Sequence, residues 1–155
     1  MSGETFLAES AAFPISLAPG TEEAGLAIML ADLIRFNLMQ DPRKWNDFNK
    51  LNRLIVIEAR DAAVTVTLEF TRGALIVHGG LFGSPRIRIS ADSKTVLELA
   101  RLSIVHGIPN LFDPIGRDLL KKTLSGSVRI SGALGNLISL IRVTRLMSVN
   151  DGMMR

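Results

Sequence analysis

The spacing of apolar residues changes along the chain and separates helical regions from strand regions. From Thr21 onward apolar residues recur every three or four positions, which predicts a helix with Thr21 as its N-cap. Asp41 and Pro42 predict the cap and the first position of a second, short helix. Residues 1–20 contain prolines and a glycine without a helical period and are expected to form an N-terminal tail. We therefore expect one folded domain over residues 21–155.

A period of two replaces the helical period at Leu54. It is clearest in the run VTVTLEFT, where Val64, Val66, Leu68 and Phe70 alternate with polar residues. Short turns separate this run from its neighbours, so the region predicts four strands in an antiparallel meander with one buried face. The four expected strands are LIVIEAR, VTVTLEFT, ALIVHGG and RIRIS.

The rest of the chain adds two helices, a fifth strand and a final helix. Ser90 is expected to cap the helix ADSKTVLELARLSI, and Asp113-Pro114 to start a helix that Gly126 ends. The run SVRIS predicts the fifth strand, and the final helix is expected over residues 133–149. The fold class is therefore α+β: a five-stranded, mainly antiparallel sheet with helices packed on one face.

The final helix is apolar on two sides. On a helical wheel, one side carries Leu134, Leu137, Ile138 and Ile141. After Arg142 the apolar positions move to the other side and are Val143, Leu146 and Met147. A helix with two apolar sides must cover two surfaces. One is the sheet, and the other is a neighbouring helix, a partner or a bound apolar ligand; a helix wedged in the core explains the pattern equally well.

Two glycines between the fifth strand and the final helix resemble a phosphate-binding turn. The dinucleotide fingerprint G-x-G-x-x-G fails here, because Ile130 stands where its first glycine should be. No second parallel strand is expected after the helix either. We instead expect Gly132 to make the turn and Gly135 to let the helix approach the sheet closely.

The composition offers little for catalysis. Hydrophobic residues make up 47% of the chain and aromatic residues 5%, which suits either a dense core or an aliphatic cavity. The chain has no cysteine, so it forms neither disulfides nor thiolate metal sites. His78 and His106 have no acid or nucleophile beside them in the sequence and are expected to be structural. We therefore expect no enzyme activity, no cofactor and no metal site.

Positive charge is concentrated towards the C-terminus. The cations of this third that we expect to meet anionic headgroups or an anionic membrane surface are Arg117, Lys121, Lys122, Arg142 and Arg145. The simpler alternative is that these cations only form a solvated surface and contact no partner. Nucleic acid is not an expected partner, because no aromatic residue follows Phe112 to stack on bases. The start of the chain has no basic signal-peptide region, so we expect a cytoplasmic protein, in part peripheral to the membrane.

The order of these elements resembles the sterol carrier protein 2 family of lipid-binding domains over residues 21–149. The resemblance is carried by VTVTLEFTRGALIVHGG leading into PRIRISADSKTVLELA. It is also carried by LSGSVRISGALGNLISLIRV, where a glycine turn joins a strand to a leucine-rich helix. The resemblance implies that sheet and helices enclose a hydrophobic tunnel. It also implies binding of a sterol, fatty acyl or isoprenoid lipid without chemistry, and an accessory role in isoprenoid quinone synthesis.

The same resemblance assigns apolar side chains to the tunnel or its lid. They are Leu30, Leu33, Ile34, Phe70, Leu99, Ile104, Leu120, Leu137, Ile141 and Leu146. The implied partners are a lipid and a biosynthetic enzyme. The alternative hypothesis is a protein–protein module, in which the same apolar faces form a homodimer or dock on an enzyme. The loop over residues 105–116 is longer and richer in proline than we expect for the family.

Overall fold

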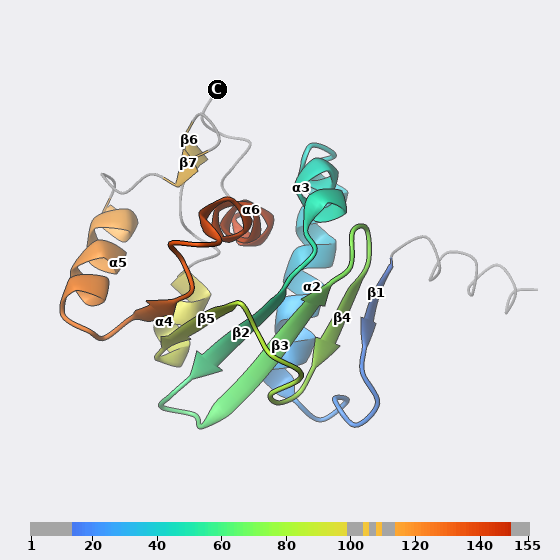
Figure 1. The fold of residues 1–155 in the computed structure, drawn as a ribbon, viewed down its shortest axis with the longest axis horizontal. Coiled ribbons are helices and arrows are strands. Elements are labelled where there is room, and N and C mark those ends of the chain that lie inside the picture. The colour runs from blue at the N-terminus through green and yellow to red at the C-terminus, as the bar shows by residue number, and fades with distance from the viewer. Residues whose placement is uncertain (1–13, 99–103, 106–107, 110–113, 150–155) are drawn as a thin grey trace, which may run out of the picture.

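A six-stranded sheet carries helices on one face in the computed structural model, which describes residues 14–98, 104–105, 108–109 and 114–149 (Figure 1). The strand order is β1-β4-β3-β2-β5-β8. The strands of this sheet are β1 Ile15–Leu17, β2 Leu54–Ala59, β3 Val64–Phe70, β4 Leu75–His78, β5 Ile87–Ala91 and β8 Arg129–Ser131. The mixed α/β class with helices on one face is confirmed, with six strands in place of the expected five.

The sixth strand comes from the segment that the sequence pattern assigned to the tail. β1 pairs in parallel with β4, and Ile15 lies opposite Leu75 in the register. Ile15 is buried, so this short strand extends the apolar face of the sheet by one row. Three residues are too short for a period of two to be recognised in the sequence.

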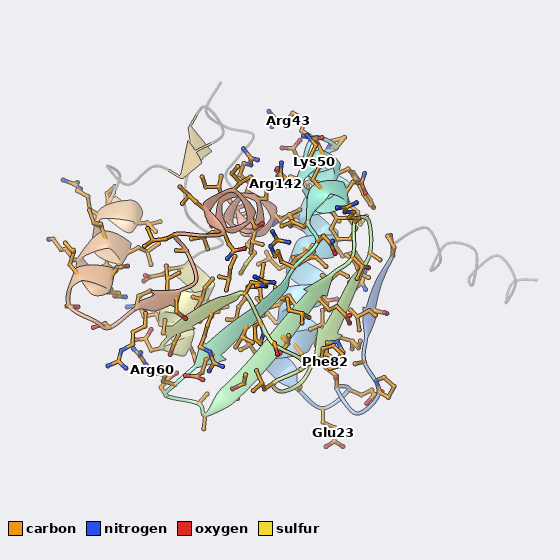
Figure 2. The ribbon with its side chains drawn as sticks, in the orientation of Figure 1. Glu23, Arg43, Lys50, Arg60, Phe82 and Arg142 are labelled. Atoms are coloured by element: carbon orange, nitrogen blue, oxygen red, sulfur yellow. The ribbon has the colours of Figure 1, made fainter. Side chains whose placement is uncertain are left out.

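The expected meander is wrong at its fourth strand. β2, β3 and β4 form antiparallel pairs, but β5 returns to the other side of β2 and pairs with it in parallel. The connection over residues 79–86 therefore crosses the sheet on the face opposite α2, where Figure 2 shows Phe82. The hydroxyl of Thr67 donates to the carbonyl of Gly80 and accepts from the backbone N–H of Phe82, which holds the connection on that face. Its glycines and proline had suggested a simple turn.

Five helices accompany the sheet in the described residues. They are α2 Gly25–Gln40, α3 Lys44–Lys50, α4 Ser93–Glu98, α5 Pro114–Leu124 and α6 Leu137–Met147. Strands β6 Ile104–Val105 and β7 Ile108–Pro109 form a separate antiparallel pair. Parts of the long 105–116 loop and residue His106 lie outside the described residues.

Two expected helix caps are wrong, and α3 begins at Lys44 with Arg43 as its N-cap, later than expected from Asp41 and Pro42. α2 begins at Gly25, and the hydroxyl of Thr21 instead accepts a hydrogen bond from the backbone N–H of Gly79 at 3.0 Å. Ser90 lies inside β5, and α4 is capped by Asp92, whose Oδ1 accepts from the backbone N–H of Thr95 at 2.8 Å. Thr21 instead accepts a hydrogen bond from the residue that follows β4, and Ser90 is part of β5. The local sequence reveals neither of these roles.

The core lies between the sheet and its helices. Register brings Ile55 opposite both Leu68 and Ile87, so one face of three neighbouring strands is continuously aliphatic. The buried side chains of α2, α4 and α6 pack on that face in a single cluster. Burial of each large aliphatic side chain contributes about 1.5–3 kcal/mol, which makes this layer the main source of stability.

The two glycines before α6 have different roles. Gly132 has φ +80°, and a Cβ added there would lie 1.8 Å from the carbonyl oxygen of Arg86. The expected turn at Gly132 is therefore present, and so is a close backbone approach. A Cβ added at Gly135 would meet nothing within 4 Å, so the expected close approach at Gly135 is wrong.

Candidate functional site

Helix α6 has one buried side and one open side. Val143, Leu146 and Met147 are buried in the core cluster. On the opposite side of the helix Leu137 is 57% exposed and Ile138 is 65% exposed. The two apolar sides seen in the sequence are therefore the core side and an outward side, and a helix wedged entirely in the core is excluded.

Buried polar side chains of α2 and α3 hold the C-terminal end of α6. Asn37 Nδ2 donates to the carbonyl oxygen of Leu146 at 2.8 Å, and Lys44 Nζ donates to the carbonyl oxygen of Arg145. Asp47 accepts from Arg145 Nε at 3.0 Å and lies 3.9 Å from Arg142 Nε. These contacts satisfy helix-end carbonyls and fix how α6 is rotated. Local spacing does not reveal these contacts, because the partners are about one hundred positions apart in the chain.

The ten predicted tunnel residues fall into different environments. Four lie together in the core cluster: Leu30, Ile34, Phe70 and Leu146. Leu33 packs against that cluster and Ile141 is half-buried. Leu120 and Leu137 are exposed. Leu99 and the side chain of Ile104 lie outside the described residues. Their role in lipid binding stays a prediction.

Further apolar side chains are exposed near the β8 edge of the sheet. Ile130 on β8 lies opposite the buried Ile89, yet it is 38% exposed. The described helices therefore do not cover the apolar face of the sheet at this edge. Exposed leucines also occur on the elements that flank β8 in the chain or in space: Leu97, Leu120, Leu124 and Leu134.

The predicted headgroup cations are not equally available. Arg142 and Arg145 lie beside Asp47, and Lys122 bridges Asp118 at 3.2 Å and Glu98 at 3.4 Å. Burial disfavours the charged form of Lys122, but the hydrogen bond to Asp118 and the charge of Glu98 outweigh it and raise its pKa. Arg117 and Lys121 are exposed on α5. Headgroup contact by these five cations stays a prediction.

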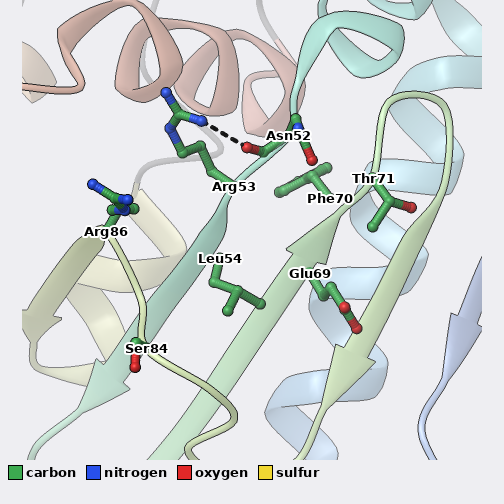
Figure 3. Close-up of a pocket in the computed structure, with 8 residues that line it drawn as sticks. All are labelled: Asn52, Arg53, Leu54, Glu69, Phe70, Thr71, Ser84 and Arg86. Atoms are coloured by element: carbon green, nitrogen blue, oxygen red, sulfur yellow. Dashed lines mark hydrogen bonds between the residues drawn. The ribbon is translucent and has the colours of Figure 1, made fainter.

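A pocket of about 300 Å³ opens where β2 and β3 meet the connection to β5 (Figure 3). Its lining residues are Asn52, Arg53, Leu54, Glu69, Phe70, Thr71, Ser84 and Arg86. Arg53 Nε donates to the side chain of Asn136, the N-cap residue of α6, at 3.0 Å. The pocket therefore lies next to the start of α6. Neither Arg53 nor Arg86 is among the candidate residues expected from the sequence.

His78 has a carboxylate neighbour that the sequence did not reveal. Its Nε2 lies 3.0 Å from Glu69 Oε1, and its ring stacks on Phe82 with the centroids 3.8 Å apart. Glu69 also lines the pocket. Glu69 fixes the orientation of the imidazole and the ring of Phe82 covers it, so we assign this pair to holding the 79–86 connection.

Two classes of site are absent from the part of the chain that the structure describes. No three histidine, aspartate or glutamate residues there come together as a metal site. In the same residues no helix is long and apolar enough to span a bilayer.

Comparisons with known proteins support the fold. The sequence matches no known family and no curated protein. A solved structure described as a UbiJ-SCP2 ubiquinone synthesis protein superposes with a TM-score of 0.57. That match has 13% identity and covers 81% of this chain and 97% of that chain. A crystal structure of sterol carrier protein 2 matches with a TM-score of 0.48 and 14% identity, over 77% of this chain and 91% of that chain.

At these identities the first likeness shows a shared fold. The chain therefore has the sterol carrier protein 2-like fold, and the resemblance found in the sequence is confirmed at the level of architecture.

Proposed function

We propose that this chain binds a lipid through the open apolar side of α6 and carries it or presents it to a partner enzyme. The observation that carries the proposal is the outward position of Leu137 and Ile138, opposite the buried side of the same helix. Exposed aliphatic side chains of this size in one area mark ligand or partner surfaces in other proteins.

An apolar chain laid on this surface would gain free energy without any catalytic group. Each buried CH₂ contributes about 0.8 kcal/mol relative to water, so a chain of ten carbons is sufficient for measurable binding. The open edge at Ile130 would lengthen the surface beyond α6.

The shared fold supports an accessory role in isoprenoid quinone synthesis as the finer form of this proposal. One protein with this fold is described as a ubiquinone synthesis protein. In that role the lipid would be a prenylated ring compound, and the partner would be an enzyme that modifies the ring. A sterol or fatty acyl ligand would instead indicate a general carrier at an anionic membrane surface.

Native mass spectrometry of the chain purified from its host tests the proposal. We expect a reproducible mass increase that organic extraction removes and that lipid analysis identifies. Absence of any lipid adduct, with no uptake from mixed lipid vesicles, would contradict lipid binding. Light scattering after size exclusion tests the alternative: an obligate dimer or complex that buries Leu137 and Ile138 without lipid would favour a protein–protein module.

A further inference from the structure

We propose that Arg53 and Arg86 bind the anionic headgroup, a phosphate or a carboxylate, of the lipid whose apolar chain lies along the open side of α6. This inference rests on the proposed function, because it gives the same ligand a headgroup site. It places the headgroup in the pocket of Figure 3, away from the five cations that the sequence suggested.

The sheet brings the backbones of these two arginines close together, and both residues line the same pocket. Arg53 immediately precedes β2 and Arg86 immediately precedes β5, and these strands pair in parallel. The backbone N–H of Arg86 donates to the carbonyl of Leu54 at 3.0 Å, which joins the two strand starts directly. Figure 3 shows both guanidinium groups on the side of the pocket nearest α6, with Glu69 on the far side.

Neither guanidinium has a carboxylate partner among the described residues. Arg53 donates only to neutral oxygens, the carbonyl of Asn52 at 2.9 Å and the side chain of Asn136 at 3.0 Å. Glu69, the one acid that lines the pocket, is paired with His78. Two positive charges on one pocket without a counter-charge favour binding of an anion, and the planar guanidinium fork matches phosphate and carboxylate oxygens.

The position of this pair suits a lipid rather than an isolated ion. Asn136, which contacts Arg53, directly precedes Leu137 at the start of the open apolar side. A headgroup held by the arginines would therefore let its chain leave along Leu137, Ile138 and Ile141. The positive end of the α6 dipole lies at the same place and adds to the attraction. The volume of about 300 Å³ is at the lower end for ligand pockets, which fits a headgroup and not a whole lipid.

Three probes separate the headgroup from the chain. Decyl phosphate carries both, decan-1-ol carries the chain alone, and inorganic phosphate carries the anion alone. Dissociation constants are measured by calorimetry on the full chain, below the concentration at which decyl phosphate forms micelles. We expect decyl phosphate to bind about tenfold or more tightly than decan-1-ol, because hydrogen bonds between charged groups contribute that much each. Inorganic phosphate should bind most weakly.

Variants that remove one charge each show which residues cause the tighter binding of decyl phosphate than of decan-1-ol. Arg53→Gln and Arg86→Gln should each reduce it, and the double variant should bind decyl phosphate and decan-1-ol about equally. Arg35→Gln is the matched control, because Arg35 carries the same charge on α2 and pairs with Asp32 at 2.8 Å. Unchanged binding of decan-1-ol by the double variant shows that it is folded and that its chain site is intact.

The outcomes distinguish failure of this inference from failure of the proposed function. Equal affinity of the native chain for both decyl probes, or an unchanged preference in the double variant, overturns the headgroup site and leaves lipid binding standing. Inorganic phosphate bound as tightly as decyl phosphate also overturns it, because the arginines would then hold a free anion. No binding of either decyl probe overturns the proposed function together with this inference.

Discussion

Asp47 on α3 accepts two hydrogen bonds from the guanidinium group of Arg145 on α6, although the two residues are 98 positions apart. Asp47 is buried, and Asn37 and Lys44 contact carbonyls of the same helix end. These contacts set the rotation of α6 and therefore decide which of its apolar sides faces outward.

Asp47→Ala should lower the free energy of unfolding by about 2–3 kcal/mol, since it removes a buried carboxylate from two arginines. The guanidinium groups are partly exposed, which keeps the loss below that of a fully buried pair. Urea denaturation measures the loss. Asp32→Ala, which breaks the exposed pair with Arg35, should cost less than about 0.5 kcal/mol. Equal losses in the two variants would contradict this role of Asp47.

Substitution of the three glycines between α5 and α6 should give graded losses of stability. Gly132→Ala combines a left-handed φ with a clash against a backbone oxygen, so we expect a loss of about 3 kcal/mol or more, or no folded protein. Gly126→Ala has the left-handed φ of +83° but open space, and should lose about 1 kcal/mol. Gly135→Ala has neither problem and should change stability by less than about 1 kcal/mol. Thermal unfolding of the three variants checks the order, and a Gly135 variant as unstable as the Gly132 variant would contradict it.

The two sides of α6 should respond differently to substitution. The double change Leu137→Ser and Ile138→Ser removes exposed apolar groups, so unfolding free energy should change by less than about 1 kcal/mol. Affinity for a ten-carbon probe should fall about tenfold or more, because that surface is lost. Leu146→Ala should instead lose about 2–5 kcal/mol of stability, because it leaves a cavity in the core. If the double variant kept its affinity for lipid, the binding surface would lie elsewhere than on α6.

The cap of α4 should make a small contribution to stability that depends on pH. Hydrogen bonds from Thr95 to the Asp92 carboxylate lower the pKa of Asp92 below its ordinary value of 3.8. A lowered folded-state pKa means that this contribution is complete above pH 3.8 and is lost as the pH falls through the lower value. Asp92→Ala should cost about 1 kcal/mol at pH 7.

The difference in free energy of unfolding between the native chain and Asp92→Ala should therefore become smaller in acid. Asp92→Asn is the control, because asparagine caps a helix without a titrating group and should keep most of the stability at every pH. Urea denaturation at several pH values between 3 and 7 measures all three proteins. A constant difference between native chain and Asp92→Ala across this range would show that the carboxylate charge is not involved.

Local patterning was sufficient for the types of the longer elements and for the two apolar sides of α6, but not for β1 or for the β6–β7 pair. The alternation at Val64, Val66 and Leu68 depends only on neighbours along the strand, because successive side chains point to opposite faces. The turn at Gly132 is likewise local, since its left-handed φ favours glycine wherever the chain goes next. The sequence runs that carry the family resemblance contain both of these features.

Strand order, the open side of α6 and the arginine pair depended on tertiary packing. β5 pairs with β2 and not with β4, although a meander satisfies the same alternation, because the connection at 79–86 is held across the sheet by Thr67. Helix α6 has two apolar sides. Contacts from Asn37 on α2 and Asp47 on α3 fix its rotation and therefore which side faces the core. Arg53 and Arg86 line one pocket only because β2 and β5 are neighbours. Each of these relationships joins residues far apart in the chain, where local spacing carries no information about which surfaces meet.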